Sequence, residues 1–488
     1  MKRRRSSVEV QPSFVTIARS PRERRLFMQF IKLFLGLAAL VLSASNSWAA
    51  SVEATLIGER TLQVIYEGKT YEFGVPEPTW VTVEDETYSN LPLFNEQAPS
   101  WAKGVGLKGV KAFECSVFGA LDENSFSLTL SDGSVLKRGV DYELDNSSGC
   151  LGRLEGGCVS QETIVLANYR YIESRIDSVV VEENGSLSYI DGVSKVLSPE
   201  PPVINDKQQR LVNIYTTVPK GELSVNSIFP VDEVFSHEPN SLNAESFVSN
   251  LEKFNRTHGL ANEIPTSNKG AARSYLPKVW EKLQNGEEVR ILAWGDSVTA
   301  CGYLPDNQRW QTIFAEMLQK KFPNAHIVML TEAWGGRSSD SYRNEPSGSP
   351  KNYQERVLAL QPDLIISEFV NDAYMDEETT IRKYSEMLED FRSRGIEWII
   401  LGPHYVRPDW MGLSSERNAE NDPRPLIKGF RRFTAENNVP FADTPTLYGK
   451  LSYAGIPYLT LMTNNINHPN EFGMKLFANA LITIFEEK

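Results

Sequence analysis

The sequence predicts an α/β domain over residues 275–488, preceded by a β-rich, sandwich-like region over residues 50–235 and a helix and linker over residues 236–274. The α/β prediction depends on apolar strand-like runs that alternate with amphipathic helix-like stretches. That pattern is typical of a parallel sheet covered by helices on both faces. The β-rich prediction depends on short alternating runs separated by tight-turn dipeptides. A length of 488 residues has room for both parts.

Residues 1–49 have the features of a signal peptide. An apolar run at 33–44 follows several lysines and arginines and is too short to span a bilayer comfortably. The small-x-small triplet at 47–49 then fits signal peptidase cleavage after Ala49. Met28 is an alternative start that would give a signal of ordinary length, and an uncleaved membrane anchor is the alternative to cleavage. We expect an exported protein, periplasmic or extracellular.

The charge of the chain excludes some partners. The sequence has 50 Lys and Arg against 63 Asp and Glu, a formal net charge of -13. Residues 1–49 hold nine of the basic and two of the acidic residues, so the remainder carries a net charge of -20. So acidic a chain repels nucleic acid and anionic lipid. We therefore expect no nucleic acid partner and no stable membrane insertion after signal cleavage, and the oligomeric state stays open.

The β-rich region contains three turn signals that predict hairpins. Gly68 separates two alternating runs, and the dipeptides Asp132-Gly133 and Asn184-Gly185 each lie between two further runs. These short strands indicate one or two sandwich-like modules. Aromatic residues in this region form either a sugar-stacking platform or ordinary core and edge positions, as aromatics often do in strands. They are Tyr66, Tyr71, Trp80, Trp101, Tyr142, Tyr169 and Tyr171.

The four cysteines show no spacing typical of zinc ligands. An exported protein can form disulfides. Cys150 and Cys158 flank a glycine-rich loop and can pair with each other, or Cys115 can pair with either. Cys301 is expected to be a buried, unpaired thiol.

The α/β domain is expected to contain five strands separated by helices, and a further helix at 243–254 precedes it. The predicted strands span 289–294, 326–330, 364–369, 398–401 and 439–442. The predicted helices span 310–318, 353–360, 381–391, 426–437 and 471–486.

Polar residues cluster in the loops at the expected carboxyl ends of these strands, where α/β sheets bind ligands. Ser297 follows the first strand, Gly336 the second and Asn371 the third, and His468 precedes the last helix. These four residues, in this order, resemble the four blocks of the SGNH/GDSL hydrolase superfamily. The resemblance covers about residues 275–488 and implies a three-layer, flavodoxin-like fold. The sequence of residues 336–338, Gly-Arg-Ser, is similar to the second block of rhamnogalacturonan acetylesterase-like carbohydrate esterases.

The resemblance implies a role for each of these residues. Ser297 is the expected nucleophile and His468 its base, since a serine hydroxyl needs a base to attack at neutral pH. The backbone N–H groups of Ser297 and Gly336 and the side-chain amide of Asn371 are the expected oxyanion hole. Arg337 and His404 are candidate substrate-binding residues. The remaining histidines show no ligand pairing, so we expect no metal and no cofactor.

One position departs from the family pattern. The residue three before the catalytic histidine is usually aspartate, and here it is Asn465. Asn465 or a backbone carbonyl can orient His468 in a dyad, since an amide oxygen can accept the Nδ1 proton. Alternatively, Asp443 or Asp372 reaches the histidine, or the enzyme is weak, because asparagine at this position favours the wrong tautomer.

The sequence therefore predicts an exported serine esterase that hydrolyses small acyl esters, in particular acetyl esters on a carbohydrate. A lipase or lysophospholipase of the same superfamily is the alternative within the enzyme class. A non-catalytic carbohydrate-binding or surface protein with a decayed hydrolase domain is the alternative from another class.

Overall fold

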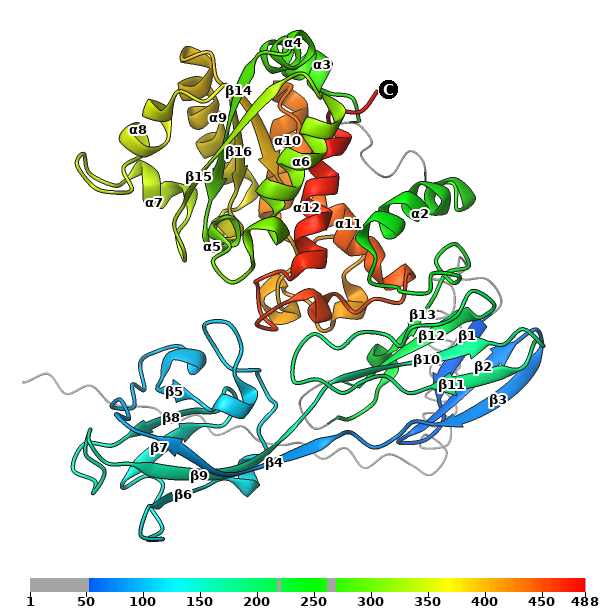
Figure 1. Ribbon diagram of the computed structural model, residues 1–488, viewed down its shortest axis with the longest axis vertical. Coiled ribbons are helices and arrows are strands. Elements are labelled where there is room, and N and C mark those ends of the chain that lie inside the picture. The colour runs from blue at the N-terminus through cyan, green and yellow to red at the C-terminus, as the bar shows by residue number, and fades with distance from the viewer. Residues whose placement is uncertain (1–51, 217–220, 261–268, 488) are drawn as a thin grey trace, which may run out of the picture. The chain divides into compact units, whose positions relative to one another are not determined.

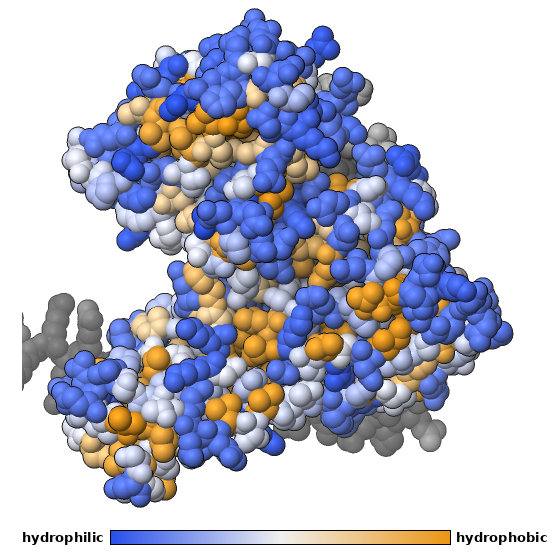
Figure 2. Space-filling model, in the orientation of Figure 1, coloured by the Kyte–Doolittle hydropathy of each residue, from blue (hydrophilic) through white to orange (hydrophobic). Residues whose placement is uncertain are grey.

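A computed structural model describes residues 52–487 of the chain, except 217–220 and 261–268. The predicted signal peptide, 1–49, lies outside these residues. Within the part that is described, no helix is long and apolar enough to cross a membrane. Figure 2 shows hydrophilic residues over most of the visible face, with hydrophobic residues in separate patches among them.

The C-terminal domain is built around a five-stranded parallel sheet (Figure 1). Its strand order is β15-β14-β16-β17-β18. The first strand in the chain, β14, lies one position from an edge, and the second, β15, forms that edge. The next three strands then follow in order on the other side of β14. This is the 2-1-3-4-5 order of doubly wound, flavodoxin-like sheets. The strands are β14 Glu288–Gly295, β15 His326–Ala333, β16 Leu364–Glu368, β17 Glu397–Leu401 and β18 Phe441–Ala442. The predicted fold class is confirmed.

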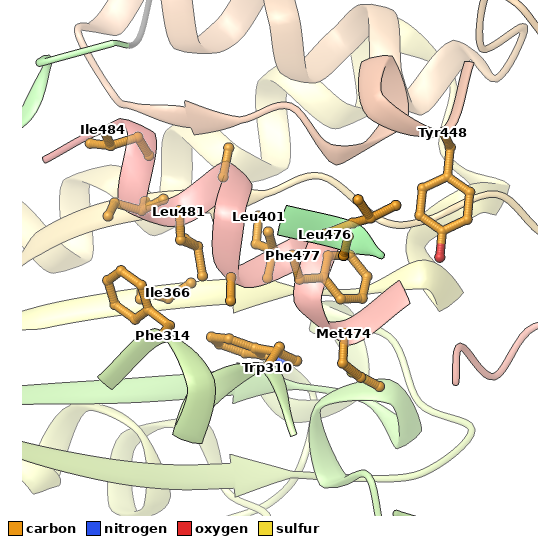
Figure 3. Packing of buried hydrophobic residues seen from close by; sticks show 14 of the residues in the cluster. Trp310, Phe314, Ile366, Leu401, Tyr448, Met474, Leu476, Phe477, Leu481 and Ile484 are labelled. Atoms are coloured by element: carbon orange, nitrogen blue, oxygen red, sulfur yellow. The ribbon is translucent and has the colours of Figure 1, made fainter. Parts of the chain in front are cut away.

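Helices cover both faces of this sheet. Successive residues of a strand point to opposite sides, and here the residues on both sides are apolar, so each face needs a covering layer. Ile291 and Ala293 of β14 belong to the core on one face, and Leu292 and Trp294 to the core on the other. Figure 3 shows α12 packed on the first face, with Phe477 and other apolar side chains of the helix gathered between it and the sheet. The first face is covered by α4 Pro277–Asn285, α6 Trp310–Lys321 and α12 Glu471–Thr483, and the second by α8 Tyr353–Arg356, α9 Glu377–Ser393 and α10 Pro425–Asn437.

The segment between the two regions contains a helix that packs into the core of the α/β domain. Helix α2, Ala244–Thr257, begins after Asn243, whose side chain accepts a hydrogen bond from Ser246 N–H. This is a typical N-cap, and the helix was expected at 243–254. Phe247 and Phe254 of α2 are buried in the same core as α12. A short helix, α3 Ala272–Tyr275, then leads into the α/β domain.

The N-terminal region consists of antiparallel sheets, as predicted. One pair of sheets is formed by a chain segment inserted between the strands of the other pair. The sheets β1-β2-β3 and β11-β10-β12-β13 share one core, which includes Leu62, Val64, Val179 and Val212. These strands are β1 Val52–Leu56, β2 Thr61–Tyr66, β3 Lys69–Gly74, β10 Arg175–Val181, β11 Leu187–Ile190, β12 Gln209–Thr216 and β13 Ile228–Pro230.

The chain between β3 and β10 forms the second pair of sheets, β4-β9-β6 and β5-β8-β7, around a separate core. Its strands are β4 Trp80–Tyr88, β5 Val105–Gly106, β6 Ser127–Leu130, β7 Tyr142–Asp145, β8 Cys150–Arg153 and β9 Val165–Ile172. Tyr142, Tyr169 and Tyr171 are buried in this core, so these aromatics are structural. All four cysteines are free thiols, and Cys301 is buried as expected.

Candidate active site

Ser297 lies directly after β14, at the carboxyl edge of the sheet, and it begins a short helix, Ser297–Ala300. The turn requires glycine at position 295, because a Cβ there would lie 2.2 Å from Thr299 Oγ1 and 2.4 Å from the backbone oxygen of Glu368. The Asp296 carboxylate caps the turn by accepting from Val298 N–H at 3.0 Å. This arrangement leaves the Ser297 side chain partly exposed beside a fully buried aspartate.

His468 lies against this serine. Its Nε2 is 3.0 Å from Ser297 Oγ, although the two residues are 171 positions apart in the chain. The imidazole is 4% exposed, and burial lowers its pKa from 6.5 to about 4. Burial favours the neutral ring, so the imidazole is uncharged at neutral pH and retains a basic nitrogen.

The loop that carries His468 is fixed by hydrogen bonds at both ends. The carbonyl of His468 accepts from Thr463 N–H at 2.7 Å, and the carbonyl of Asn467 lies 2.8 Å from His404 Nε2. His404 is completely buried, and its burial lowers its pKa well below 6.5. The prediction that His404 contacts substrate at the rim is therefore corrected. A histidine after a strand in a Gly-Pro-His sequence suggests exposure, but here the buried ring contacts the carbonyl of Asn467 in the loop that carries His468.

Asn464 is the residue in contact with the second ring nitrogen of His468. Its side-chain oxygen accepts from the backbone N–H groups of Ile466, Asn467 and His468 at 3.0, 2.9 and 3.1 Å. Only oxygen can accept these three bonds, so the amide nitrogen must be the atom that lies 2.6 Å from His468 Nδ1. An amide N–H donates to an unprotonated nitrogen. In this arrangement, the ring proton is therefore on Nε2, the atom that faces Ser297.

Asp443 and Asp372, the acids predicted as alternatives for orienting His468, have other partners. Asp443 caps helix α11, Thr444–Lys450, by accepting from Thr446 N–H, and it pairs with Arg431 at 3.0 Å. Asp372 accepts from Ser339 and Tyr384. Asn465, at the family position, has a positive φ of 55° and makes no hydrogen bond to His468 within the described residues. Asn464, one position earlier, was not found from the sequence because the family spacing points to 465.

Three potential N–H donors lie near Ser297. The backbone N–H groups of Ser297 and Gly336 donate to no acceptor in the described chain. Gly336 has a φ of 69°, a region that favours glycine, and a Cβ on neighbouring Gly335 would lie 3.7 Å from the Ser297 Cβ. Asn371 donates through both its backbone N–H and its Nδ2 to Asp296, at 3.0 and 2.8 Å. The second Nδ2 hydrogen of Asn371 remains available to a substrate.

Three buried carboxyl groups lie close to the turn that carries Ser297. Burial raises the pKa of Asp296 to about 7 and that of Asp372 to about 6, and it raises the pKa of Glu368 well above its usual value. Hydrogen bonds from Asn371 and Val298 oppose the shift of Asp296. In the described ranges, no three His, Cys, Asp or Glu side chains form a potential metal site.

Two aromatic rings that the sequence did not associate with the site contact His468. The ring of Phe113, from the N-terminal region, lies edge-to-face on the imidazole with centroids 5.2 Å apart, and that of Tyr303 does so at 5.1 Å. No local pattern marks position 113 as functional, since the contact joins distant segments. Arg337, a predicted substrate-binding residue, is exposed; its guanidinium lies 4.9 Å from the Trp334 ring and forms no ion pair among the described residues.

Comparison with known proteins finds a family match within the C-terminal domain. The sequence model of the GDSL-like lipase/acylhydrolase family matches residues 293–476. No protein with a curated description matches the chain significantly.

Similar solved structures are related to this chain at low identity. A two-domain esterase (CEX) active on acetylated mannans is 19% identical over 46% of this chain and 57% of its own, with a TM-score of 0.36. A GDSL-like lipase from Parabacteroides merdae is 17% identical over 41% of this chain and 96% of its own, with a TM-score of 0.33. The acetyl xylan esterase AlAXEase is 18% identical over 40% of this chain and 97% of its own, with a TM-score of 0.31. The chain thus spans a little over half the length of the mannan esterase that it matches.

Proposed function

Because the C-terminal part of this chain is a GDSL-like lipase/acylhydrolase domain, we propose that the protein is a serine ester hydrolase in which Ser297 is the nucleophile and His468 the base. The observation that carries the proposal is the 3.0 Å approach of Ser297 Oγ to His468 Nε2 at the carboxyl edge of the parallel sheet. The nucleophile and its base are then within the range that proton transfer requires.

The proposed reaction begins when Oγ attacks the ester carbonyl and His468 Nε2 takes the hydroxyl proton. Negative charge develops on the carbonyl oxygen, and the N–H groups of Ser297 and Gly336 and the free Nδ2 hydrogen of Asn371 are available to stabilise it. The Asp296 carboxylate holds Asn371 in place, because it accepts from both the main chain and the side chain of that residue. His468 then gives its proton to the departing alcohol, and water releases the acyl group by the same steps in reverse.

The contact with Asn464 makes this reaction slow in our proposal. Nε2 can accept the serine proton only when the ring hydrogen is on Nδ1, and Nδ1–H would then face the amide nitrogen of Asn464. Two donors facing each other repel, so the base-competent tautomer is a minor state. The low pKa of His468, about 4, also reduces the driving force for proton uptake.

For the substrate, we propose a small acyl ester, in particular an acetyl ester, on a carbohydrate that the protein meets after export. The similarity of 336–338 to the second block of carbohydrate esterases supports this choice, as does the presence of two β-sandwich-like modules ahead of the hydrolase domain. Export rests on the signal-peptide pattern of residues 1–49.

A second candidate, a carbohydrate-binding protein with an inactive hydrolase domain, is favoured by one observation only. The Asn464 amide stabilises the tautomer that cannot act as a base. The positions of Ser297 and Gly336, with N–H groups unused by the fold, favour the enzyme.

The test is hydrolysis of p-nitrophenyl acetate by the wild type, Ser297→Ala and His468→Ala, with His326→Ala as a matched control. His326 is exposed at the start of β15. We expect slow turnover in the wild type and the control, and its loss in the two site variants. Turnover that survives Ser297→Ala contradicts the proposal. Comparing acetyl with octanoyl esters then separates an acetylesterase from a lipase, and acetate release from acetylated polysaccharides identifies the glycan.

A further inference from the structure

The N-terminal region contacts the candidate catalytic histidine directly. Phe113 lies in the loop between β5 and β6, and its half-buried ring meets His468 and, at 4.8 Å between centroids, Tyr303. Two residues on, Cys115 Sγ donates to the carbonyl oxygen of Asn464 at 3.6 Å. The loop therefore contacts the histidine and the residue that controls its tautomer.

The chemistry of ester hydrolysis tells which part of a substrate this loop meets. The base of a serine hydrolase delivers its proton to the leaving oxygen, so groups beside the imidazole lie next to the alcohol half of the ester. The donors on Ser297, Gly336 and Asn371 serve the carbonyl instead. Phe113 is thus placed against the leaving group, not the acyl group.

An aromatic surface continues from this loop. The guanidinium of Arg407 lies 4.5 Å from the ring of Phe118 and 5.6 Å from that of Trp410. Arg407 N–H donates to the carbonyl of Ile466, which ties this group to the catalytic loop. Trp410 is 44% exposed, and its ring lies 5.8 Å from that of Trp101 in the N-terminal region.

A cavity of about 520 Å³ adjoins the aromatic surface, and Trp101 and Cys115 both line it. Lys111 and Glu114, which are exposed, supply charged hydrogen-bonding groups to the same cavity. Pockets of this size with aromatic walls and a few polar groups are typical of sites for small ligands. Sugar rings combine apolar C–H faces that stack on aromatic rings with hydroxyl groups that take hydrogen bonds. The acidic chain disfavours an anionic polymer.

We propose that the N-terminal region completes the active site with an alcohol-side subsite for a neutral oligosaccharide. Phe113 lines this subsite beside the imidazole, and Trp101 and Trp410 bind the sugar rings that lie beyond the scissile ester. The inference rests on the proposed function for its reaction, and it adds the leaving-group specificity and the residues that set it.

The experiment compares two acetyl esters with different alcohols, p-nitrophenyl acetate and an acetylated xylo-oligosaccharide. The variants are Phe113→Ala, Trp101→Ala and Trp410→Ala in the full chain. Trp80→Ala is the matched control, because Trp80 is 39% exposed and packs under Arg170 of its own sheet. We expect the ratio of kcat/KM for the oligosaccharide to that for p-nitrophenyl acetate to fall about tenfold in each site variant, the loss of roughly one aromatic contact. The control should keep the wild-type ratio.

Binding is measured separately, by calorimetry of the oligosaccharide with Ser297→Ala and with the double variant Ser297→Ala/Trp410→Ala. We expect binding to the first and about tenfold weaker binding to the second. An unchanged kinetic ratio or equal binding overturns the subsite, while esterase activity on p-nitrophenyl acetate would leave the proposed function standing. Tryptophan-dependent binding without serine-dependent turnover has the opposite meaning: the subsite stands and the proposed function fails.

Discussion

Replacing Asn464 with aspartate should accelerate the reaction, because the change converts a donor that faces His468 Nδ1 into an acceptor. One carboxylate oxygen can keep the three backbone hydrogen bonds that the amide oxygen now accepts. The other oxygen takes the place of Nδ2, 2.6 Å from the ring nitrogen. Nδ1–H then has an acceptor, and the free Nε2 faces Ser297. The bond from Nδ2 to Asn467 Oδ1 is lost, but the Asn467 amide can turn to donate instead.

The size of the gain follows from what the wild type must give up. To accept Nδ1–H, the Asn464 amide has to turn over, which places its nitrogen against three backbone donors and breaks three hydrogen bonds. At about 1 kcal/mol each, this costs about 3 kcal/mol, or about 10² in rate. The carboxylate also stabilises the imidazolium, and the opposite change in a serine protease triad costs about 10⁴ in kcat. We therefore expect Asn464→Asp to raise kcat by about 10²–10⁴.

The assay is steady-state hydrolysis of p-nitrophenyl acetate by the wild type, Asn464→Asp and the double variant Asn464→Asp/Ser297→Ala. Asn465→Asp is the matched control, since it places the same charge one residue away without a hydrogen bond to the ring. The carboxylate should also move the acid limb of the pH profile upward from about 4, because a nearby negative charge raises the histidine pKa. A folded Asn464→Asp protein with wild-type kcat, or an equal gain in Asn465→Asp, would refute the reasoning.

Three further predictions follow from the same geometry. In the wild type, kcat/KM should stay constant from neutral pH down to about pH 5, since burial lowers the pKa of His468 to about 4, and a profile that falls through pH 6.5 contradicts this. Gly295→Ala should lower the free energy of unfolding by roughly 1–3 kcal/mol and reduce activity, because its Cβ meets Thr299 and the main chain of Glu368; a thermal melt unchanged from the wild type would count against the close packing. Burial raises the pKa of Asp372 to about 6 in the folded state, against about 3.9 in the unfolded chain. Between these two pH values the folded state binds more protons than the unfolded state. The free energy of unfolding therefore falls as pH rises from about 4 to 6. Asp372→Asn should remove this contribution, so its stability relative to the wild type should be greater at pH 8 than at pH 4, and denaturant unfolding at both values measures the difference.

Local patterns in the sequence were enough to predict the sheet and its helices. β14 is an apolar run that ends in a Gly-Asp turn, and α12 follows a loop that closes with a capping asparagine, Asn470. These features depend on residues close together in the chain. The observed limits differ by a few residues where strands or helices fray, as at α12, which ends at Thr483 instead of 486.

The sequence was less informative where the site depends on distant or rotated residues. Asn465 has a positive φ, and the asparagine before it contacts the ring instead. A motif defined by sequence spacing does not show which of two neighbouring asparagines makes that contact. His404 is buried by Tyr448 and Phe477, which come from later elements. Phe113 reaches His468 across 355 positions of sequence, so only the folded chain brings the two rings together.

The proposed serine nucleophile is tested most directly by intact-protein and peptide mass spectrometry after exposure to p-nitrophenyl acetate at low pH and short times. The account predicts one acetyl group on the peptide that contains Ser297, no acetylation of that peptide in Ser297→Ala, and loss of the group as acetate on longer incubation. An unmodified Ser297 in a protein that still turns over the ester would contradict the account.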